Sequence, residues 1–186
     1  MYDGLNANIS LGNGDITSSS LALDANDCPC ITWDEEVSNS NSNNSEIIFV
    51  KWDGYKWLNS EGYKYNGKNA NISKNDRIST EPFLVIDTLN RPCIVWQDSS
   101  TRFINLYTNY EIFFVLWDGK NWINAEKQLY DGKNANISKN VEDSDFPSIA
   151  LDSLGNPCIT WVDMYCPPIV KLFLREYFQS QPFHLQ

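Results

Sequence analysis

Short apolar runs alternate with clusters of turn-forming residues along the chain. A run that ends in Leu-Asp or Ile-Asp is followed by a turn such as 152–157, Asp-Ser-Leu-Gly-Asn-Pro, and then by a run such as 158–161, Cys-Ile-Thr-Trp. Asp, Gly and Asn occupy turn positions readily, and Pro is tolerated as the first residue of a strand. The pattern therefore predicts short antiparallel strands joined by tight turns.

A second hairpin follows in two places. The third run, at 47–52 and at 112–117, is apolar on both faces, so we expect a strand that is covered on both sides. An Asp-Gly pair ends each run and supplies the positive φ angles that a two-residue turn requires. A fourth strand follows the turn. Each hairpin has a Trp before its turn and a Trp after it: Trp52, Asp53 and Trp57 in the first copy, and Trp117, Asp118 and Trp122 in the second.

Two markers recur with one period. Asn-Ala-Asn-Ile-Ser begins at 6, 69 and 134, and Pro-Cys-Ile-Thr/Val-Trp begins at 29, 92 and 157, so both are 63 and then 65 residues apart. Independent markers with the same period indicate a tandem repeat. We expect units at 1–64, 65–129 and 130–186 that together form one domain. The third unit is degenerate at its end, because 169–176 is apolar but has no Trp-Asp-Gly turn.

Four-stranded antiparallel sheets repeated in tandem are typical of propeller blades. The Leu-Asp strand end, the Gly-Asn-Pro turn, the Ile-Thr-Trp strand and the Trp-Asp-Gly-x-x-Trp hairpin resemble the tandem β-propeller repeats of bacterial extracellular and surface proteins. They are more distantly similar to sialidase-type Asp-box repeats, although the spacing from Asp152 to Trp161 differs from that of a true Asp-box. The resemblance covers nearly all of residues 2–165. It implies an all-β fold of three four-stranded antiparallel blades, an extracellular or cell-surface location, and a binding scaffold more readily than an enzyme.

The number of units predicts how the protein assembles. Propellers usually close with four to eight blades, so three blades leave two sheet faces open. Apolar residues of the first and third units would then form exposed patches of the kind that mark an interface. We expect a homodimer in which two sets of three blades make a six-bladed ring. A fragment of a longer propeller is the alternative. The residues that we expect on the open faces are Ile48, Val50 and Trp52 in the first unit and Ile149, Leu151, Ile159 and Trp161 in the third.

Charge excludes some partners. The chain carries 14 Lys and Arg residues against 24 Asp and Glu residues, a formal net charge of −10. Such a charge repels phosphate backbones, and no run of basic residues offsets it, so nucleic acid is not expected as a partner. No apolar run approaches the roughly 20 residues that cross a bilayer, so membrane insertion is not expected either.

The seven tryptophans divide into two groups. Trp33, Trp96 and Trp161 fall in the middle of predicted central strands, where we expect them to fill the contact between blades. The other four flank the hairpin turns and lie near one rim. Exposed aromatic rings beside Asp and Asn can stack on the apolar face of a sugar while polar groups bind its hydroxyls. The candidate ligand-binding residues are therefore Trp52, Asp53, Trp57, Trp117, Asp118 and Trp122.

Metal and disulfide sites have little support in the sequence. Asp24, Asp87 and Asp152 offer one acid per turn, whereas a calcium loop needs several oxygen ligands, so we expect them to cap turns. The five cysteines include three at equivalent positions of different units, which cannot all pair, and we expect all five to be reduced. They are Cys28, Cys30, Cys93, Cys158 and Cys166.

Catalysis also has little support. His184 is the only histidine, so triads and multi-histidine metal sites are not available, and no pair of carboxylates stands out as a glycosidase would require. We expect no enzymatic activity and no cofactor. The sequence predicts a recognition or adhesion module, with a carbohydrate as the leading ligand. A protein-binding scaffold is the first alternative and a propeller related to glycan hydrolases is the second.

Overall fold

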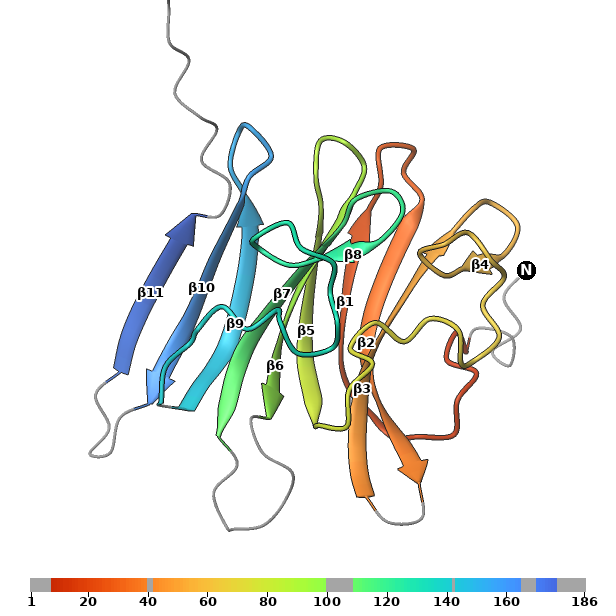
Figure 1. The fold of residues 1–186 in the computed structure, drawn as a ribbon. Coiled ribbons are helices and arrows are strands. Elements are labelled where there is room, and N and C mark those ends of the chain that lie inside the picture. Colours follow the sequence, from red (N-terminus) through yellow and green to blue (C-terminus); the bar gives the residue numbers. More distant parts are fainter. Residues whose placement is uncertain (1–7, 40–41, 100–108, 142, 165–169, 177–186) are drawn as a thin grey trace, which may run out of the picture.

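The computed structural model describes residues 8–39, 42–99, 109–141, 143–164 and 170–176. These residues form strands, turns and loops, and none of them lies in a helix, which confirms the expected all-β class. Three antiparallel sheets follow one another along the chain and lie side by side, from orange through green to blue in Figure 1. The number and order of the sheets match the three expected repeats.

The first two sheets have four strands each, in chain order. Sheet 1 contains β1 (Ile16–Leu23), β2 (Pro29–Asn39), β3 (Ser42–Trp52) and β4 (Trp57–Leu58). Sheet 2 contains β5 (Ser79–Ile86), β6 (Pro92–Ser99), β7 (Tyr110–Trp117) and β8 (Trp122–Ile123). Sheet 3 contains β9 (Asp143–Leu151), β10 (Pro157–Met164) and β11 (Val170–Glu176), three strands within the described residues.

The first strands of the sheets bring the sheets together. β1 contacts β5, and β5 contacts β9, so the first strands of the sheets lie together on the inner side. The short fourth strands of sheets 1 and 2 lie at the opposite, outer edge of their sheets. This arrangement is that of propeller blades. The described residues form three such blades, and closure into a six-bladed ring stays a prediction.

Side chains of aspartate fix the turns, as the sequence predicts. The Asp87 Oδ1 accepts hydrogen bonds from the backbone N–H groups of Leu89, at 2.9 Å, and Arg91, at 2.8 Å. Asp24 and Asp152 accept the equivalent bonds in their own turns. In the Asp-Gly hairpins, Gly54 and Gly119 have φ angles of 97° and 100°, which glycine adopts without steric cost.

The three repeated tryptophans are in the core, as expected. Trp33, Trp96 and Trp161 expose 3%, 0% and 2% of their surface. Each indole N–H donates to the acid two residues further along the strand, at 3.0 Å to Glu35 Oε2, 3.2 Å to Asp98 Oδ2 and 2.9 Å to Asp163 Oδ1. A buried indole N–H needs an acceptor, so the recurring Trp-x-acid pair belongs to the packing of the repeat.

The Asn-Ala-Asn-Ile-Ser marker forms the outer edge of a sheet. The Ala70 carbonyl accepts from Phe49 N at 3.0 Å, and Ile72 N donates to the Ile47 carbonyl at 2.8 Å, which pairs residues 70–72 with β3. Ser73 Oγ accepts from Ile47 N and donates to the buried carboxylate of Glu46. Residues 69–73 thus complete sheet 1, although they follow the expected unit boundary after residue 64.

The expected apolar patches are largely covered. Ile48 and Val50 expose only 5% and 0% of their surface, because they form a buried cluster with Trp33, Tyr65 and Ala70, against which Ile9 also packs. Ile159 and Trp161 are buried as well, since they belong to the core cluster that β10 shares with β7 of sheet 2. The expectation that these four residues lie on open faces is wrong. Trp52, Ile149 and Leu151 are half-buried.

One carboxylate of β9 makes the stability of the fold depend on pH. Burial first, and then the negative charges of Asp143 and Glu81, raise the pKa of Asp145 to about 6. An unfolded aspartate titrates near 3.9. Between about pH 4 and pH 6 the folded protein therefore holds a proton that the unfolded chain has released. Stability linked to Asp145 must decrease as the pH rises through this window.

Asp145→Asn should remove that dependence. We expect the variant to unfold at a higher temperature than the wild type at pH 8, because no charge has to be buried, and to lose this advantage at pH 4. Thermal unfolding followed by circular dichroism at both pH values measures the difference. Asp152→Asn is the control, because hydrogen bonds from Asn156 lower the pKa of Asp152 and its effect must have the opposite sign. An equal gain for Asp145→Asn at both pH values would contradict the linkage.

Candidate functional site

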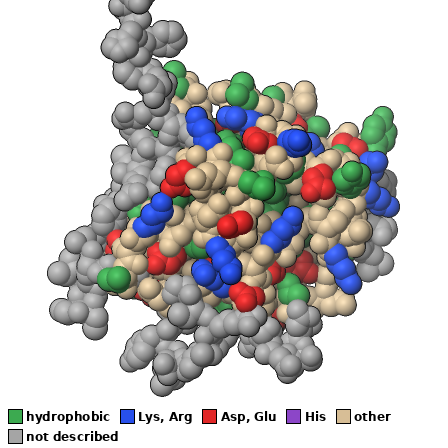
Figure 2. All heavy atoms as spheres, in the orientation of Figure 1, with side chains coloured by type: hydrophobic (Ala, Val, Ile, Leu, Met, Phe, Trp, Pro, Cys, Tyr) green, Lys and Arg blue, Asp and Glu red, His purple; other side chains and the backbone are tan. Residues whose placement is uncertain are grey.

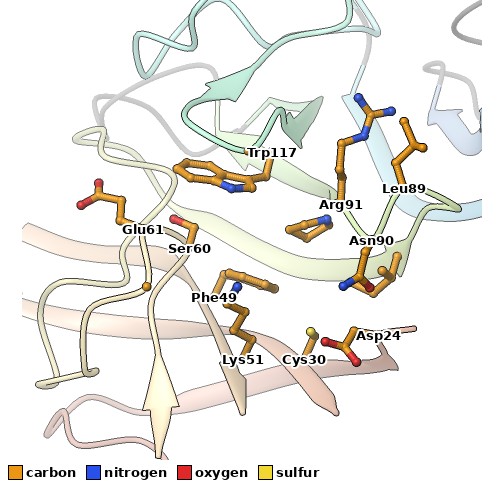
Figure 3. A pocket seen from close by; sticks show the side chains of 14 residues that line it. Asp24, Cys30, Phe49, Lys51, Ser60, Glu61, Leu89, Asn90, Arg91 and Trp117 are labelled. Carbon is orange, nitrogen blue, oxygen red and sulfur yellow. The ribbon is translucent and has the colours of Figure 1, made fainter. Parts of the chain in front are cut away.

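A pocket of about 380 Å³ opens between sheets 1 and 2, at the end where the β1–β2 and β5–β6 turns lie (Figure 3). Ligand sites in proteins commonly have volumes of about 300–1,000 Å³. β2, β3 and the loop after β4 provide the sheet 1 side, and β5, the β5–β6 turn and the end of β7 provide the sheet 2 side. The lining residues are Asp24, Cys30, Phe49, Lys51, Ser60, Glu61, Gly62, Ile86, Leu89, Asn90, Arg91, Pro92, Trp117 and Gly119.

The indole ring of Trp117 forms one side of the pocket. The half-buried Trp117 indole lies at the wall, across the pocket from Phe49 and Lys51 in Figure 3. Trp122 supports it from behind, with ring centroids 5.4 Å apart, and itself packs edge-on against Phe49 at 5.6 Å. The Trp122 indole N–H donates to Ser60 Oγ at 3.2 Å. The Trp117 ring is therefore held in place by packing before any ligand arrives.

The base of the pocket is apolar. Phe49 exposes 1% of its surface and Cys30 exposes 2%. Burial, and then the nearby Asp24 carboxylate, raise the pKa of the Cys30 thiol to about 12. The thiol is thus neutral at physiological pH and is unreactive as a nucleophile. This part of the pocket offers a ligand apolar contact and no charge.

An arginine is fixed at the edge. Arg91 donates to Asp87 Oδ2 from Nε at 2.7 Å and from a terminal nitrogen at 2.6 Å. Such a two-point pairing sets the orientation of the guanidinium, and its remaining N–H groups can still donate to a ligand. The Arg91 side chain remains one-third exposed. It is a pre-oriented hydrogen-bond donor on the sheet 2 side.

Positive and negative side chains balance around the opening. Lys51 and Arg91 are opposed by Asp24 and Glu61 among the lining residues. Figure 2 shows the same mixture over the molecular face that it displays, where acidic and basic side chains are interspersed. Asn90 adds an amide next to Arg91, and its Oδ1 accepts from Ala25 N at 2.8 Å, which ties the two neighbouring turns together. The pocket can bind hydroxyl groups without attracting one sign of charge.

The structure divides the sequence-predicted site residues between two hairpins. Trp117 lines the pocket, and Trp122 is buried behind it with 8% of its surface exposed. Trp52 and Trp57 pack against each other at the edge of sheet 1, with centroids 5.3 Å apart. Asp118 is exposed, and its Oδ1 accepts from Asn121 N and Lys120 N in the hairpin turn. These bonds hold the pKa of Asp118 below its usual value, and Asp53 is bound in the same way by Lys56 N and Tyr55 N.

Sequence reasoning missed the polar half of the pocket. Three of its side chains, Lys51, Ser60 and Arg91, break the repeat, because the equivalent positions in the next unit have lost the polar group or the charge. A comparison of the units position by position would have singled them out. The replacements are Leu116 for Lys51, Ala125 for Ser60, and Asn156 for Arg91. The acids Asp24 and Glu61 recur as Asp87 and Glu126.

Among the described residues, the cysteines and acidic side chains form neither a disulfide nor a metal site in addition to the pocket. Cys28, Cys30 and Cys93 are free thiols, and Cys166 lies outside the described residues. Within the ranges that the structure describes, no group of three or more His, Cys, Asp or Glu side chains is placed to hold a metal ion. Nor does the described part of the chain contain a helix long and apolar enough to cross a membrane.

Comparisons with known proteins give fold neighbours at low identity. No protein-family model and no curated protein matches the sequence. Among solved structures, the chain is similar to a fucose lectin from Kordia zhangzhouensis in complex with methyl-fucoside. The identity is 14% and the TM-score 0.49, over 86% of this chain and 92% of that one. It is also similar to the endo-arabinase from Bacteroides thetaiotaomicron VPI-5482, with 13% identity and a TM-score of 0.48 over 90% of this chain, and it spans 57% of the endo-arabinase chain.

Proposed function

We propose that this protein is a non-enzymatic carbohydrate-binding module, and that the pocket between sheets 1 and 2 is its binding site. One observation carries the proposal: the pre-positioned Trp117 ring faces a set of hydrogen-bonding side chains across a pocket of about 380 Å³. A sugar ring has one apolar face and a circumference of hydroxyls. An aromatic wall opposite Lys51, with Arg91 beside it on the sheet 2 side, is complementary to both.

The balance of charge narrows the ligand class. Two cations and two carboxylates line the pocket, and the Arg91 charge is already paired with Asp87. An anionic sugar would be repelled by the carboxylates of Asp24 and Glu61, which line the same pocket. Neutral sugars avoid this repulsion, and their hydroxyls both donate and accept hydrogen bonds. We therefore assign the site to neutral mono- or oligosaccharides.

Trp117→Ala should abolish most of this binding. Removing the stacking wall is expected to weaken affinity for a neutral glycan by at least about tenfold, equivalent to about 1.4 kcal/mol. A glycan-array screen identifies a ligand, and titration calorimetry then compares the variants. Trp52→Ala is the matched control, because Trp52 occupies the same position in the first unit but does not line the pocket. It should keep its affinity within about twofold.

The same experiment tests the alternatives. If the array captures no neutral glycan, or if both variants lose affinity equally, the pocket is not a sugar site and a protein ligand becomes the leading interpretation. Release of new reducing ends from the glycan that is identified would show hydrolysis and contradict the non-enzymatic assignment. Loss of that release in both Asp24→Asn and Glu61→Gln would then place the chemistry in this pocket.

A further inference from the structure

The second and third Asn-Ala-Asn-Ile-Ser segments, at 69–73 and 134–138, each join two neighbouring sheets. Residues 70–72 pair with β3 of sheet 1, while Ile72 lies in the core cluster of Trp96 in sheet 2. The hydroxyl of Tyr130, in the loop that follows β8 of sheet 2, donates to the Ser73 carbonyl at 2.8 Å. Residues 135–137 pair with β7 in the same way, and Ile137 lies in the cluster of Trp161 in sheet 3. The backbone of each segment thus pairs with one sheet, while its isoleucine side chain packs on the next sheet.

Within the described part of the chain, residues 8–10 of the N-terminal copy pack on sheet 1 but pair with no strand. Ile9 packs against the cluster of Trp33, in the place that Ile72 takes near Trp96. Leu11 closely approaches Gly67, as its repeat equivalent Lys74 approaches Gly132. By equivalence, their strand partner would be the third strand of a preceding sheet. No such sheet precedes sheet 1 among the described residues, and none of the described strands pairs with this backbone edge.

A hollow of about 430 Å³ lies beside the same segment. Gly12, Gly14 and Ile48 are among the residues that line it. At the junction of sheets 1 and 2, the start of β3 lies against the corresponding stretch of chain. There Asn44 Nδ2 donates to the Asn75 carbonyl at 3.3 Å, and Ser45 forms a bridge with Ile78. In the repeat, Gly12 and Asp15 correspond to Asn75 and Ile78, so the third strand of a preceding sheet would begin beside these two residues.

Sheet 3 offers the complementary edge. Its third strand, β11, pairs with β10 so that Phe173 lies opposite Trp161, just as Phe113 of β7 lies opposite Trp96. In sheets 1 and 2 the far side of the third strand is paired with the fourth strand and with the Asn-Ala-Asn-Ile-Ser segment. No strand among those that the structure describes pairs with the far side of β11.

We propose that a second copy of this chain closes both edges. Residues 8–10 of each copy pair with β11 of the other, a two-fold rotation relates the copies, and six sheets complete the ring. The interface rests on backbone pairing, and not on the apolar patches that the sequence suggested. It does not depend on what the pocket between sheets 1 and 2 binds, and the dimer would present that pocket twice.

The repeat fixes the register of the pairing. Asn71 bridges Ile48, and Asn136 bridges Phe113, with the hydrogen bonds on the residues to either side. By equivalence, Asn8 of one copy lies opposite Phe173 of the other. Directly opposed residues of this kind, which exchange no hydrogen bond with each other, have Cα atoms about 4.5 Å apart. That spacing is within the range that a disulfide bridges.

Light scattering coupled to size exclusion tests the assembly on the unmodified protein. We expect one peak at twice the 21.3 kDa chain mass that persists on dilution to about the micromolar range. A peak at the chain mass would overturn the proposal. A ladder of larger species would also overturn it, because two-fold closure leaves no edge for a third copy.

A crosslink tests the register. The double variant Asn8→Cys with Phe173→Cys should form a covalent dimer under mild oxidation, with both chains joined twice. The control double variant, Asn8→Cys with Leu172→Cys, is one residue out of register and should crosslink at least about tenfold more slowly. The single variants measure any contribution of the native cysteines. Equal crosslinking in the two double variants would contradict the pairing, even if the protein is a dimer.

Discussion

Trp96→Ala should lower the free energy of unfolding by about 3–5 kcal/mol, the range found when a large aromatic side chain is removed from a core. The ring is fully buried, with centroids 5.7 Å from Phe113 and 6.0 Å from Tyr130. Its removal leaves a cavity between sheets 1 and 2 and takes away the donor to Asp98. Because domains of this size are typically stable by only about 5–15 kcal/mol, the loss is a large share of the total.

Urea unfolding followed by far-ultraviolet circular dichroism measures this effect without relying on tryptophan fluorescence. Tyr55→Ala is the control, because Tyr55 is 90% exposed and a surface substitution should change the free energy by no more than about 0.5 kcal/mol. If Trp96→Ala costs less than about 1 kcal/mol, the sheets do not pack through this residue as described.

Asp98→Ala should be almost as damaging, at about 3–5 kcal/mol, although the residue is acidic and small. Its carboxylate is fully buried and accepts from Ser79 Oγ at 2.7 Å, Asn75 Nδ2 at 2.8 Å and the Trp96 indole N–H. Arg77 lies 3.6 Å from the second oxygen. Alanine would leave these buried donors and the arginine without their acceptor, and an unsatisfied buried polar group costs more than a hydrogen bond contributes.

Asp98→Asn separates the hydrogen bonds from the charge. The amide keeps one acceptor oxygen and nearly the same volume, so we expect a smaller loss in urea unfolding than for alanine. The double variant Trp96→Ala with Asp98→Ala should lose less than the two single losses combined, because the two residues share a hydrogen bond. Full additivity, or equal losses for Asn and Ala, would show that the buried acceptor is not what Asp98 provides.

The sequence predicted the local part of the fold well. Asp24, Asp87 and Asp152 cap turns through their own neighbours, and such short-range chemistry is visible in a single chain. The burial of the repeated tryptophans followed from their place in apolar strands. The role of residues 69–73 could not be deduced in the same way, because it depends on β3 behind the segment and on Trp96 in front of it. The repeat in the sequence shows that the segment recurs, but it does not show which sheet the segment pairs with.

The candidate site was predicted only in part, for a similar reason. Trp117 stood out because tryptophan beside a hairpin is conspicuous. Lys51, Ser60 and Arg91 come from two different units and meet only because sheet 1 and sheet 2 pack side by side. The spacing of these residues in the sequence does not predict a binding site. The signal that could have found them is that each differs from its equivalent in the next unit. A residue needed only for the packing of the blade is expected to recur in every unit.

The segments that belong to one sheet and pack on the next also govern how the protein unfolds. When residues 69–73 detach from β3, sheet 1 loses its outer pairing, and the core around Trp96 loses Ile72 in the same event. A blade in this protein is therefore not a separate folding unit, and the loss of one blade weakens the next. We expect a single cooperative transition across the sheets, with similar amide-exchange protection in β3 and β6, and no stepwise fraying from one blade to another.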